Sequence, residues 1–241
     1  MKFKTSITDI QNSEEIIRGE KLESLVSNHS FVETILLILI GKLPTDKEKR
    51  MLDAILTSVI DHGPGVASAM TARISASAKN PLHASVAAGL LGFGERHGMA
   101  VEGSMEFLLA TKGERNLAGK VKDLKEQKVR IPGYGHKVFT DKDPRAETLF
   151  ALARELDIFG EHCQLAHDIH RELNAISSRP LPINVDGALA SILCDMGFDS
   201  KLGNGIFLIG RLPGLIAHII EENNSGEGIR RMEKDEVEFT N

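Results

Sequence analysis

The segment from Ile131 to Arg145 reads IPGYGHKVFTDKDPR and joins a glycine-rich turn to the start of a helix. Glycine tolerates positive φ and lets the backbone approach a neighbour closely, so Gly133 and Gly135 predict a tight turn. His136 follows this turn directly. Neither helix capping nor core packing readily explains a histidine there, which makes His136 a candidate functional residue.

The second half of this segment predicts a helix start. Asp143 is a preferred N-cap type and Pro144 suits the first helical position, so we expect a helix running toward Leu156. Arg145 then lies in the first turn, where the helix end carries partial positive charge. An arginine is unfavourable there unless an anion shares the side chain and the free N–H groups. His136 and Arg145 therefore indicate a site for a small, negatively charged molecule.

Outside this segment, apolar residues recur mainly at helical spacing, which predicts an all-α fold. Eleven helices are expected, over residues 20–27, 31–40, 47–59, 64–77, 82–96, 99–109, 117–128, 144–156, 161–177, 187–196 and 204–222. The chain has one tyrosine and no tryptophan, so small and aliphatic side chains must pack the helices, with a close approach expected over Ala84 to Leu91. A subdomain boundary is expected near Gly98, where an apolar helix gives way to a more charged section.

Composition limits the function classes. The 241 residues are 41% hydrophobic, enough for one large or two modest domains. A net charge of −5 argues against a nucleic-acid binder. Cys163 and Cys194 form no CxxC pair, so neither a disulfide framework nor a zinc site is indicated. The run Ile35 to Ile40 is too short to span a bilayer and no signal core is evident, so we expect a soluble cytoplasmic protein without a membrane partner.

Charge is unevenly distributed along the chain. Between Thr111 and Arg145 there are ten Lys or Arg against five Asp or Glu, although the whole chain is acidic. A positive region beside a glycine-rich loop suits a polyphosphorylated ligand. A solvated helix face is the simpler alternative.

Several motifs together carry a family resemblance. The stretch Pro132 to His136 with Asp143 to Arg145 resembles the citrate synthase superfamily. The other landmarks follow in the expected order: Arg18 to Leu25, Ser30 to Glu33, Gly41 to Thr45, Asp61 to Pro64, Arg96 to Gly98, Asn184 to Gly187 and Gly210 to Gly214. Each motif alone is weak evidence, whereas their order is specific.

Within the superfamily, the chain is most similar to stand-alone citryl-CoA lyase and to the carboxy-terminal module of ATP citrate lyase. It is shorter than a usual citrate synthase, and the stretches 61–64, 184–187 and 204–211 resemble the lyase forms. The tail from Arg231 to Phe239 also resembles the lyase ending. One departure is Met99 after Gly98, where family members commonly have a second glycine.

The resemblance implies a citrate synthase-like architecture and a reaction. A large helical domain (residues 1–98 and 198–241) would carry an inserted small helical domain (99–197), and the two would close over substrate in a homodimer. The implied activity is reversible cleavage of citryl-CoA to acetyl-CoA and oxaloacetate through a thioester enolate, in central carbon metabolism. His136 would take the hydroxyl proton, His97 would hydrogen-bond the thioester oxygen, and Asp186 would protonate the enolate carbon.

The resemblance also implies the binding residues. Arg145 and Arg211 would hold substrate carboxylates, His62 would add a hydrogen bond, and Arg231 would reach the active site of a neighbouring subunit. CoA, as part of substrate and product, would contact the backbone at Ile131, Gly133, Tyr134 and Gly135. No tightly bound cofactor or metal is expected, and a citryl-CoA synthetase is a candidate partner.

Most of these residues also have structural alternatives. His97 could stabilise the carbonyl end of a helix, and Asp186 could cap the helix expected from residue 187. His62 could be a turn residue and Arg211 a surface arginine. The three histidines at positions 162, 167 and 170 are close in sequence, but His162 falls off the face shared by the other two and no ligand set is complete.

Two other functions fit the same pattern. One is a citrate or 2-methylcitrate synthase with a shortened amino terminus, which would hydrolyse citryl-CoA. The other is a non-catalytic CoA-binding or scaffold subunit, for which Met99 is the main argument.

Overall fold

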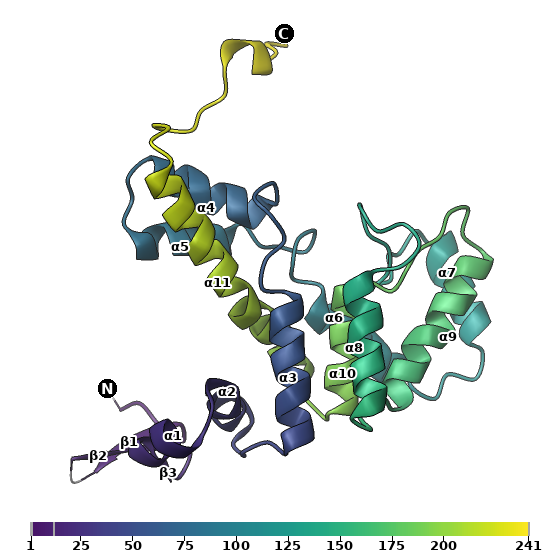
Figure 1. Cartoon of the computed structure of the whole chain (residues 1–241). Coiled ribbons are helices and arrows are strands. Elements are labelled where there is room, and N and C mark those ends of the chain that lie inside the picture. The colour runs from purple at the N-terminus through teal and green to yellow at the C-terminus, as the bar shows by residue number, and fades with distance from the viewer. Residues whose placement is uncertain (1, 12, 241) are drawn as a thin grey trace.

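The computed structural model describes residues 2–11 and 13–240, and over these residues the chain forms eleven α-helices and a small sheet (Figure 1). The sheet consists of β1 (Thr8–Gln11), β2 (Glu14–Ile17) and β3 (Glu20–Lys21). The helices are α1 (Leu22–Asn28), α2 (Phe31–Ile40), α3 (Asp46–Ser58), α4 (Ala67–Ser77), α5 (Leu82–Leu91), α6 (Val101–Thr111), α7 (Leu117–Glu126), α8 (Pro144–Glu155), α9 (Glu161–Ala175), α10 (Val185–Asp195) and α11 (Gly203–Asn224). The all-α prediction is confirmed, and each expected helix is present: α2 has the predicted bounds, and the other helices differ from prediction at one or both ends.

Helix starts follow the local sequence. Ser30 and Glu33 form a capping box at α2, as do Thr45 and Glu48 at α3. The predicted cap of α8 is also confirmed, because the Asp143 side chain accepts from the N–H of Arg145.

The amino-terminal sheet is not predicted by the sequence pattern. Its strands pair antiparallel in the order β1-β2-β3, and the third occupies the first turn of the helix expected over residues 20–27. The strands are short and mostly exposed, with Ile17 the buried residue among them. Strands exposed on both faces need no alternation of apolar and polar residues, which removes the signal used to detect them.

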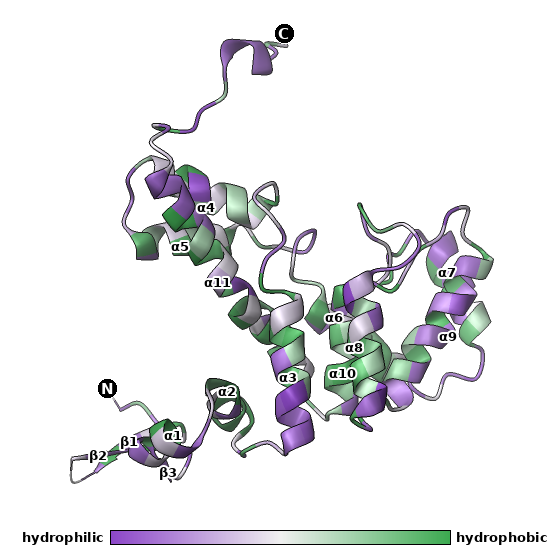
Figure 2. Cartoon of the chain, viewed as in Figure 1, coloured by the Kyte–Doolittle hydropathy of each residue, from purple (hydrophilic) through white to green (hydrophobic). Residues whose placement is uncertain are grey.

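Helix α10 is the centre of the fold. Nearly all of its residues are buried, and it packs against α6, α8 and α9. Figure 2 shows α10 as a largely hydrophobic helix, beside α8 and α9, which mix hydrophilic and hydrophobic residues. The main core continues from this group into α2, α3 and the beginning of α11. It therefore crosses the domain boundary expected near Gly98, and the two-domain division stays a prediction.

A second group of helices, α4, α5 and α11, lies on the other side of α3 (Figure 1). The close approach predicted over Ala84 to Leu91 is confirmed, because a Cβ on Gly89 would lie 3.0 Å from Cβ of Ala72. Helix α5 ends at Leu91, five residues before the predicted end. Directly after it, a Cβ on Gly92 would meet the backbone of Ser68 at 2.9 Å.

Helix α11 spans both groups. The stretch 200–224 is long and apolar enough to cross a membrane by length and composition, and 44% of its apolar window is buried inside the fold. It packs against α3, α4, α5 and α6 and carries the buried Arg211, as a core helix does. After Asn224 the chain leaves this helix as an extended tail (Figure 1).

Candidate active site

The glycine-rich loop lies directly against the amino-terminal end of α10. Gly133 has φ +88°, and a Cβ there would lie 2.7 Å from Cα of Gly187, so neither position accepts a side chain without a shift. The N–H of Asn184 donates to the carbonyl of Gly133 (3.0 Å). This contact brings the loop and the first turn of α10 together although about fifty residues separate them.

Further bonds use the polar groups of the same loop. The N–H of Gly135 donates to Pro182 (2.7 Å), and its carbonyl accepts from the Asn184 side chain (2.9 Å). The buried Tyr134 donates its hydroxyl to the carbonyl of Ala166 (2.9 Å). Several of the peptide groups expected to serve CoA are thus already paired within the fold, and the glycines serve first to seat the loop.

Asp143 connects three parts of the site. Its carboxylate accepts from the N–H of Arg145 at the start of α8 and from the N–H of Val185 at the start of α10 (3.1 and 3.0 Å). It also forms an ion pair with the Arg145 side chain (2.8 Å). Burial favours a raised pKa for Asp143, but these bonds and the charge of Arg145 outweigh it and lower the pKa. The anion that Arg145 was expected to need is therefore supplied, within the chain, by Asp143.

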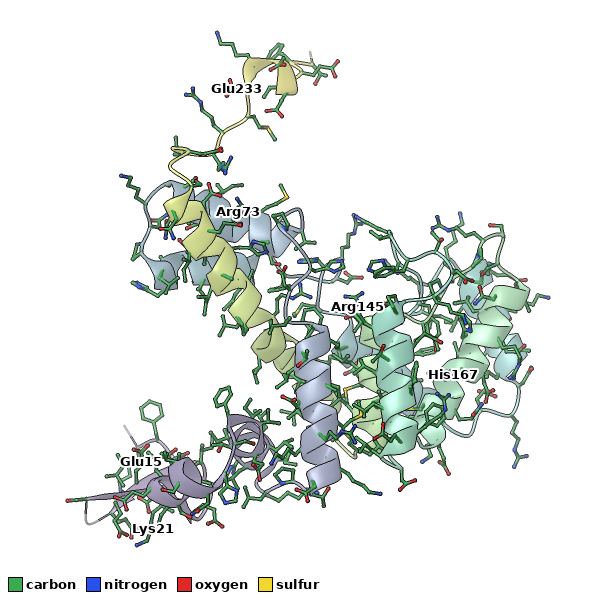
Figure 3. All side chains as sticks on the ribbon, viewed as in Figure 1. Glu15, Lys21, Arg73, Arg145, His167 and Glu233 are labelled. Atoms are coloured by element: carbon green, nitrogen blue, oxygen red, sulfur yellow. The ribbon has the colours of Figure 1, made fainter. Side chains whose placement is uncertain are left out.

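His136 is surrounded by N–H groups. Its Nδ1 accepts from the N–H groups of Val138 and Phe139, both at 3.1 Å, and its Nε2 lies 3.5 Å from a guanidinium nitrogen of Arg145. Figure 3 labels Arg145 at the beginning of α8. Burial lowers the pKa of His136 and the charge of Arg145 lowers it further, against the raising effect of Asp143, which disfavours the imidazolium ion. Because Nδ1 accepts two hydrogen bonds, Nε2 is the nitrogen that can exchange a proton with a ligand.

His97 lies in a turn rather than at a helix end, so the helix-end alternative is wrong. Its Nε2 lies 2.8 Å from the hydroxyl of Ser68 on α4, and its ring stacks on Phe93 (centroids 5.0 Å apart). Burial, and then the charge of Arg211, lower its pKa. Gly98 has φ +76°, whereas Met99 keeps negative φ and packs against the core, so position 99 needs no glycine for its backbone.

Asp186 occupies the first turn of α10 but does not cap it. Asn184 is the N-cap, because its side chain accepts from the N–H of Gly187 (3.1 Å), so the capping alternative for Asp186 is wrong. The Oδ1 atom of Asp186 is buried and has no hydrogen-bond partner among the described residues. Burial raises the pKa of Asp186 to about 6, against the lowering effect of Arg145 and Arg211. A carboxyl with this pKa can exchange a proton near neutral pH.

Arg211 and His62 extend the site toward α11. Arg211 is 3% exposed and donates from Nε to the carbonyl of Val59 (2.5 Å), which rules out the surface alternative. The ring of His62 meets that of His136 edge-on, with centroids 5.5 Å apart. Burial lowers the pKa of His62, and so do the charges of Arg145 and Arg211. His62 lies in the connection between α3 and α4, just before the turn at residues 64–65, and its ring faces His136.

Two cavities are lined by the glycine-rich loop and its neighbours. One, of about 640 Å³, is lined by His97, Asp186, Gly133 and Arg130 among others. The other, of about 760 Å³, is lined by Ile131, Tyr134, Gly135 and His136, with a basic rim of Lys125, Lys128, Arg130, Lys137 and Arg179. Arg130 contributes to both. The structure therefore gathers the predicted catalytic residues around the glycine-rich loop.

Arg231 lies in the exposed tail and lines neither of these cavities within its own chain, so its predicted contact with a neighbouring subunit stays a prediction. Ser68 and Asn184, which hold His97 and the loop, were missed. The cap position of Asn184 before α10 was a usable signal, whereas a serine in a helix of alanines and serines gave none.

The histidines at 162, 167 and 170 do not form a metal site. His162 pairs with Asp195 (2.9 Å), and His167 bonds the carbonyl of Cys163 (2.8 Å) and packs on Phe150. Over residues 2–11 and 13–240, no group of three or more His, Cys, Asp or Glu is arranged to hold a metal ion.

Comparison with solved structures gives a match over the whole chain. A citryl-CoA lyase from Hydrogenobacter thermophilus is 46% identical over 99% of this chain and 94% of that one, with a TM-score of 0.93. An ATP citrate lyase from Methanosaeta concilii, solved with (3S)-citryl-CoA, shares the fold at 24% identity; the match covers 100% of this chain and 42% of that one, with a TM-score of 0.88.

Comparisons with curated proteins and with a family model both give citrate synthases. Citrate synthase 2 of Bacillus subtilis is 30% identical over 205 residues, which are 84% of this chain and 55% of that protein. The chain spans 55% to 60% of the length of this and two other bacterial citrate or 2-methylcitrate synthases. The model of the citrate synthase C-terminal domain matches residues 45–232. The chain belongs to the citrate synthase family.

Proposed function

We propose that this protein is a citryl-CoA lyase, which cleaves citryl-CoA reversibly to acetyl-CoA and oxaloacetate. The observation that carries the proposal is the 46% identity with the Hydrogenobacter thermophilus citryl-CoA lyase over nearly the full length of both chains. The juxtaposition of His97, Asp186 and His136 supports it, because the reaction needs a donor for a thioester oxygen and two proton-exchanging groups.

Cleavage breaks the bond between the thioester methylene carbon and the carbon that carries the hydroxyl. As electrons move onto the thioester, its oxygen becomes enolate-like and His97 donates a hydrogen bond to it. When the Ser68 hydroxyl donates to Nε2 of His97, the ring proton stays on Nδ1 and is available for this task. A well-aimed donor at a developing oxyanion is worth about 3 kcal/mol.

The two remaining groups move protons. Asp186 gives its proton to the enolate carbon, and its pKa of about 6 suits a carboxyl that must also act as a base in the condensation direction. Nε2 of His136 receives the hydroxyl proton. Because Nδ1 already accepts two N–H groups, Nε2 can do so only when the ring is an imidazolate anion, a form that the N–H groups of Val138 and Phe139 and the guanidinium of Arg145 stabilise.

Two charged groups hold the substrate. Arg145 and Arg211 bind the free carboxylates of the citryl group, because each has guanidinium nitrogens beyond those used for Asp143 and Val59. His62 contacts the ring of His136 edge-on, lies near enough to both arginines for their charges to lower its pKa, and adds a hydrogen bond.

CoA binds in the second cavity, along Ile131, Tyr134 and Gly135, and reaches Gly133, which lines the first cavity. The loop's backbone is already paired in part, so affinity rests largely on the basic rim of this cavity, with its five Lys and Arg side chains facing the CoA phosphates. No tightly bound cofactor or metal takes part.

The assembly we propose is a homodimer in the cytoplasm, in which residues 1–98 with 198–241 form the large domain and 99–197 the small one. Exposed apolar side chains on the second helix group support a subunit interface, among them Met70, Ile74, Leu91 and Ile220. Arg231 then reaches the neighbouring site through the tail, and closure of the domains keeps water from citryl-CoA. A citryl-CoA synthetase supplies the substrate.

A coupled assay tests the proposal. Purified protein is incubated with citryl-CoA, and oxaloacetate release is followed with malate dehydrogenase, with Asp186→Ala as the inactive control. Rapid oxaloacetate release by wild type alone is expected. Equal absence of activity in both proteins would sink the assignment and favour a scaffold.

The second candidate is a citrate or 2-methylcitrate synthase, favoured by the 30% identity with the Bacillus subtilis enzyme. Incubation with acetyl-CoA and oxaloacetate separates the two. Steady release of free CoA and citrate would identify a synthase, whereas a lyase forms citryl-CoA without hydrolysing it.

A further inference from the structure

A buried carboxylate lies near the end of α11. The side chain of Glu222 is 1% exposed and accepts from two arginines, Nε of Arg73 on α4 at 2.8 Å and Nε of Arg230 in the tail at 2.6 Å. A second nitrogen of Arg230 lies 3.2 Å from the other carboxylate oxygen. Figure 3 labels Arg73 beside the carboxy-terminal part of α11. A buried ion is stable in such a place only when it is paired, so this carboxylate keeps both arginines close.

The backbone is fixed at the same residue. The N–H of Arg230 donates to the hydroxyl of Ser77, the last residue of α4, at 2.9 Å. The Arg230 side chain also pairs with Glu227 (2.8 Å), which closes the loop after α11. Hydrogen bonds from Arg230 hold the pKa of Glu222 below its usual range, so the carboxylate stays ionised.

Arg230, held by Glu222 and Ser77, anchors the tail, and the residues directly after it are exposed. Residues 231–240 are exposed, and within the described ranges they make no hydrogen bond or ion pair to the body of the chain. Arg231 is the first of them. An anchor at the preceding residue restricts the directions that Arg231 can take, whereas a tail tethered at Asn224 would spread it over a much larger volume.

We propose that Glu222 is a positioning residue for catalysis, which holds Arg230 so that Arg231 is presented to the active site of the neighbouring subunit. This proposal rests on the proposed function, in which Arg231 binds substrate across the dimer. The Ser77 hydroxyl and the Arg73 guanidinium complete the anchor. The active site of one subunit is then complete only when α4 and α11 of the neighbouring subunit pack against each other correctly.

The substitution Glu222→Gln tests the proposal, because it keeps the shape and removes the charge. We expect KM for citryl-CoA to rise about tenfold in a folded dimer, since a misplaced substrate contact costs about tenfold or more. Glu221→Gln is the matched control. It is the same change one residue earlier, at an exposed side chain that pairs with Arg73 and not with the tail, and it should leave KM unchanged.

A double-substitution cycle separates positioning from general destabilisation. If Glu222 acts through Arg231, then Glu222→Gln has no further effect on KM in an Arg231→Ala background. Arg230→Gln supplies an independent variant should Glu222→Gln fail to fold. It leaves Glu222 paired with Arg73 and should raise KM by a similar factor.

The outcomes distinguish the positioning role of Glu222 from the substrate-binding role of Arg231. If Arg231→Ala impairs the enzyme while Glu222→Gln and Arg230→Gln retain the wild-type KM, the positioning role is overturned and the proposed function stands. An equal rise in KM with and without Arg231 also overturns it. If Arg231→Ala itself has no effect on KM or kcat, both the role of Arg231 and the positioning role are overturned.

Discussion

At the scale of single residues, the groups around the His136 ring determine which of its protonation states is favoured. Two backbone N–H groups at Nδ1 oppose an imidazolium ion, and the nearby charge of Arg145 does the same. In the proposed mechanism, the active form of the site contains one exchangeable proton. Cleavage would begin with this proton on Asp186 and with His136 as an imidazolate, and condensation would begin with it on Nε2 of a neutral His136.

This proton count predicts the pH dependence. Cleavage produces no net proton, so kcat/KM for the two directions must change with pH in the same way. As pH falls through about 6, Asp186 becomes protonated while Nε2 of His136 keeps its proton. The site then holds two protons instead of one, and both kcat/KM values should decline. Initial rates in both directions between about pH 5 and pH 9 test this. Activity that instead falls as pH rises through this range would show that His136 works as an imidazolium ion.

Ser68 is the second residue for which a prediction follows. It is fully buried and bonds His97, so Ser68→Ala should release the ring and lower kcat about 10- to 100-fold with little change in Tm. Ser85→Ala is a matched control, because Ser85 is equally buried on α5 but bonds Ser75. Comparable losses of kcat in the two variants would contradict the role of Ser68.

At the scale of secondary-structure elements, Asp143 joins the starts of α8 and α10 through one buried carboxylate. Its helix cap was predictable from the sequence. Its bond to the N–H of Val185 was not, because 42 residues separate the two. This single side chain fixes both helices that carry Arg145 and Asp186.

We predict that Asp143→Ala lowers the free energy of unfolding by about 3 kcal/mol, since it removes a cap and leaves Arg145 without its partner. Asp199→Ala, at the exposed cap of the short 3-10 helix Ser200–Leu202, should cost about 1 kcal/mol at most. Denaturant unfolding measures both changes. Because folding lowers the pKa of Asp143, its contribution is complete above about pH 4 and is lost as pH falls through the folded pKa. Equal losses in the two variants would show that Asp143 is only a cap.

At the scale of the whole molecule, the site is built from both helix groups. His97 is held by α4, Asp186 lies on α10 and Arg211 lies on α11, so the relative placement of the groups sets the geometry of the reaction. Arg231 is the exception, because its tail extends away from its own site (Figure 1).

Mixed dimers test whether the tail acts across subunits. Asp186→Ala and Arg231→Ala are each expected to be impaired as pure dimers. A mixed dimer places one intact Asp186 site next to one intact Arg231 tail, so about half of the dimers formed at random regain one working site. Recovery of roughly a quarter of wild-type activity on mixing unfolded and refolded subunits is expected. No recovery, with dimers verified by size, would show that Arg231 acts within its own chain.

Eleven helices and the cap at Asp143 were predictable from the sequence, because helical periodicity and capping are local properties of the chain. The order of the motifs also predicted the site residues, whose roles stay predictions. The sequence pattern missed the exposed sheet near the amino terminus, which has no such period. Three features became visible only in the folded chain: Asn184, and not Asp186, caps α10, Ser68 holds His97, and Asp143 pairs with Arg145. These depend on burial and on contacts between distant segments, as does the raised pKa of Asp186, whose largest cause is burial.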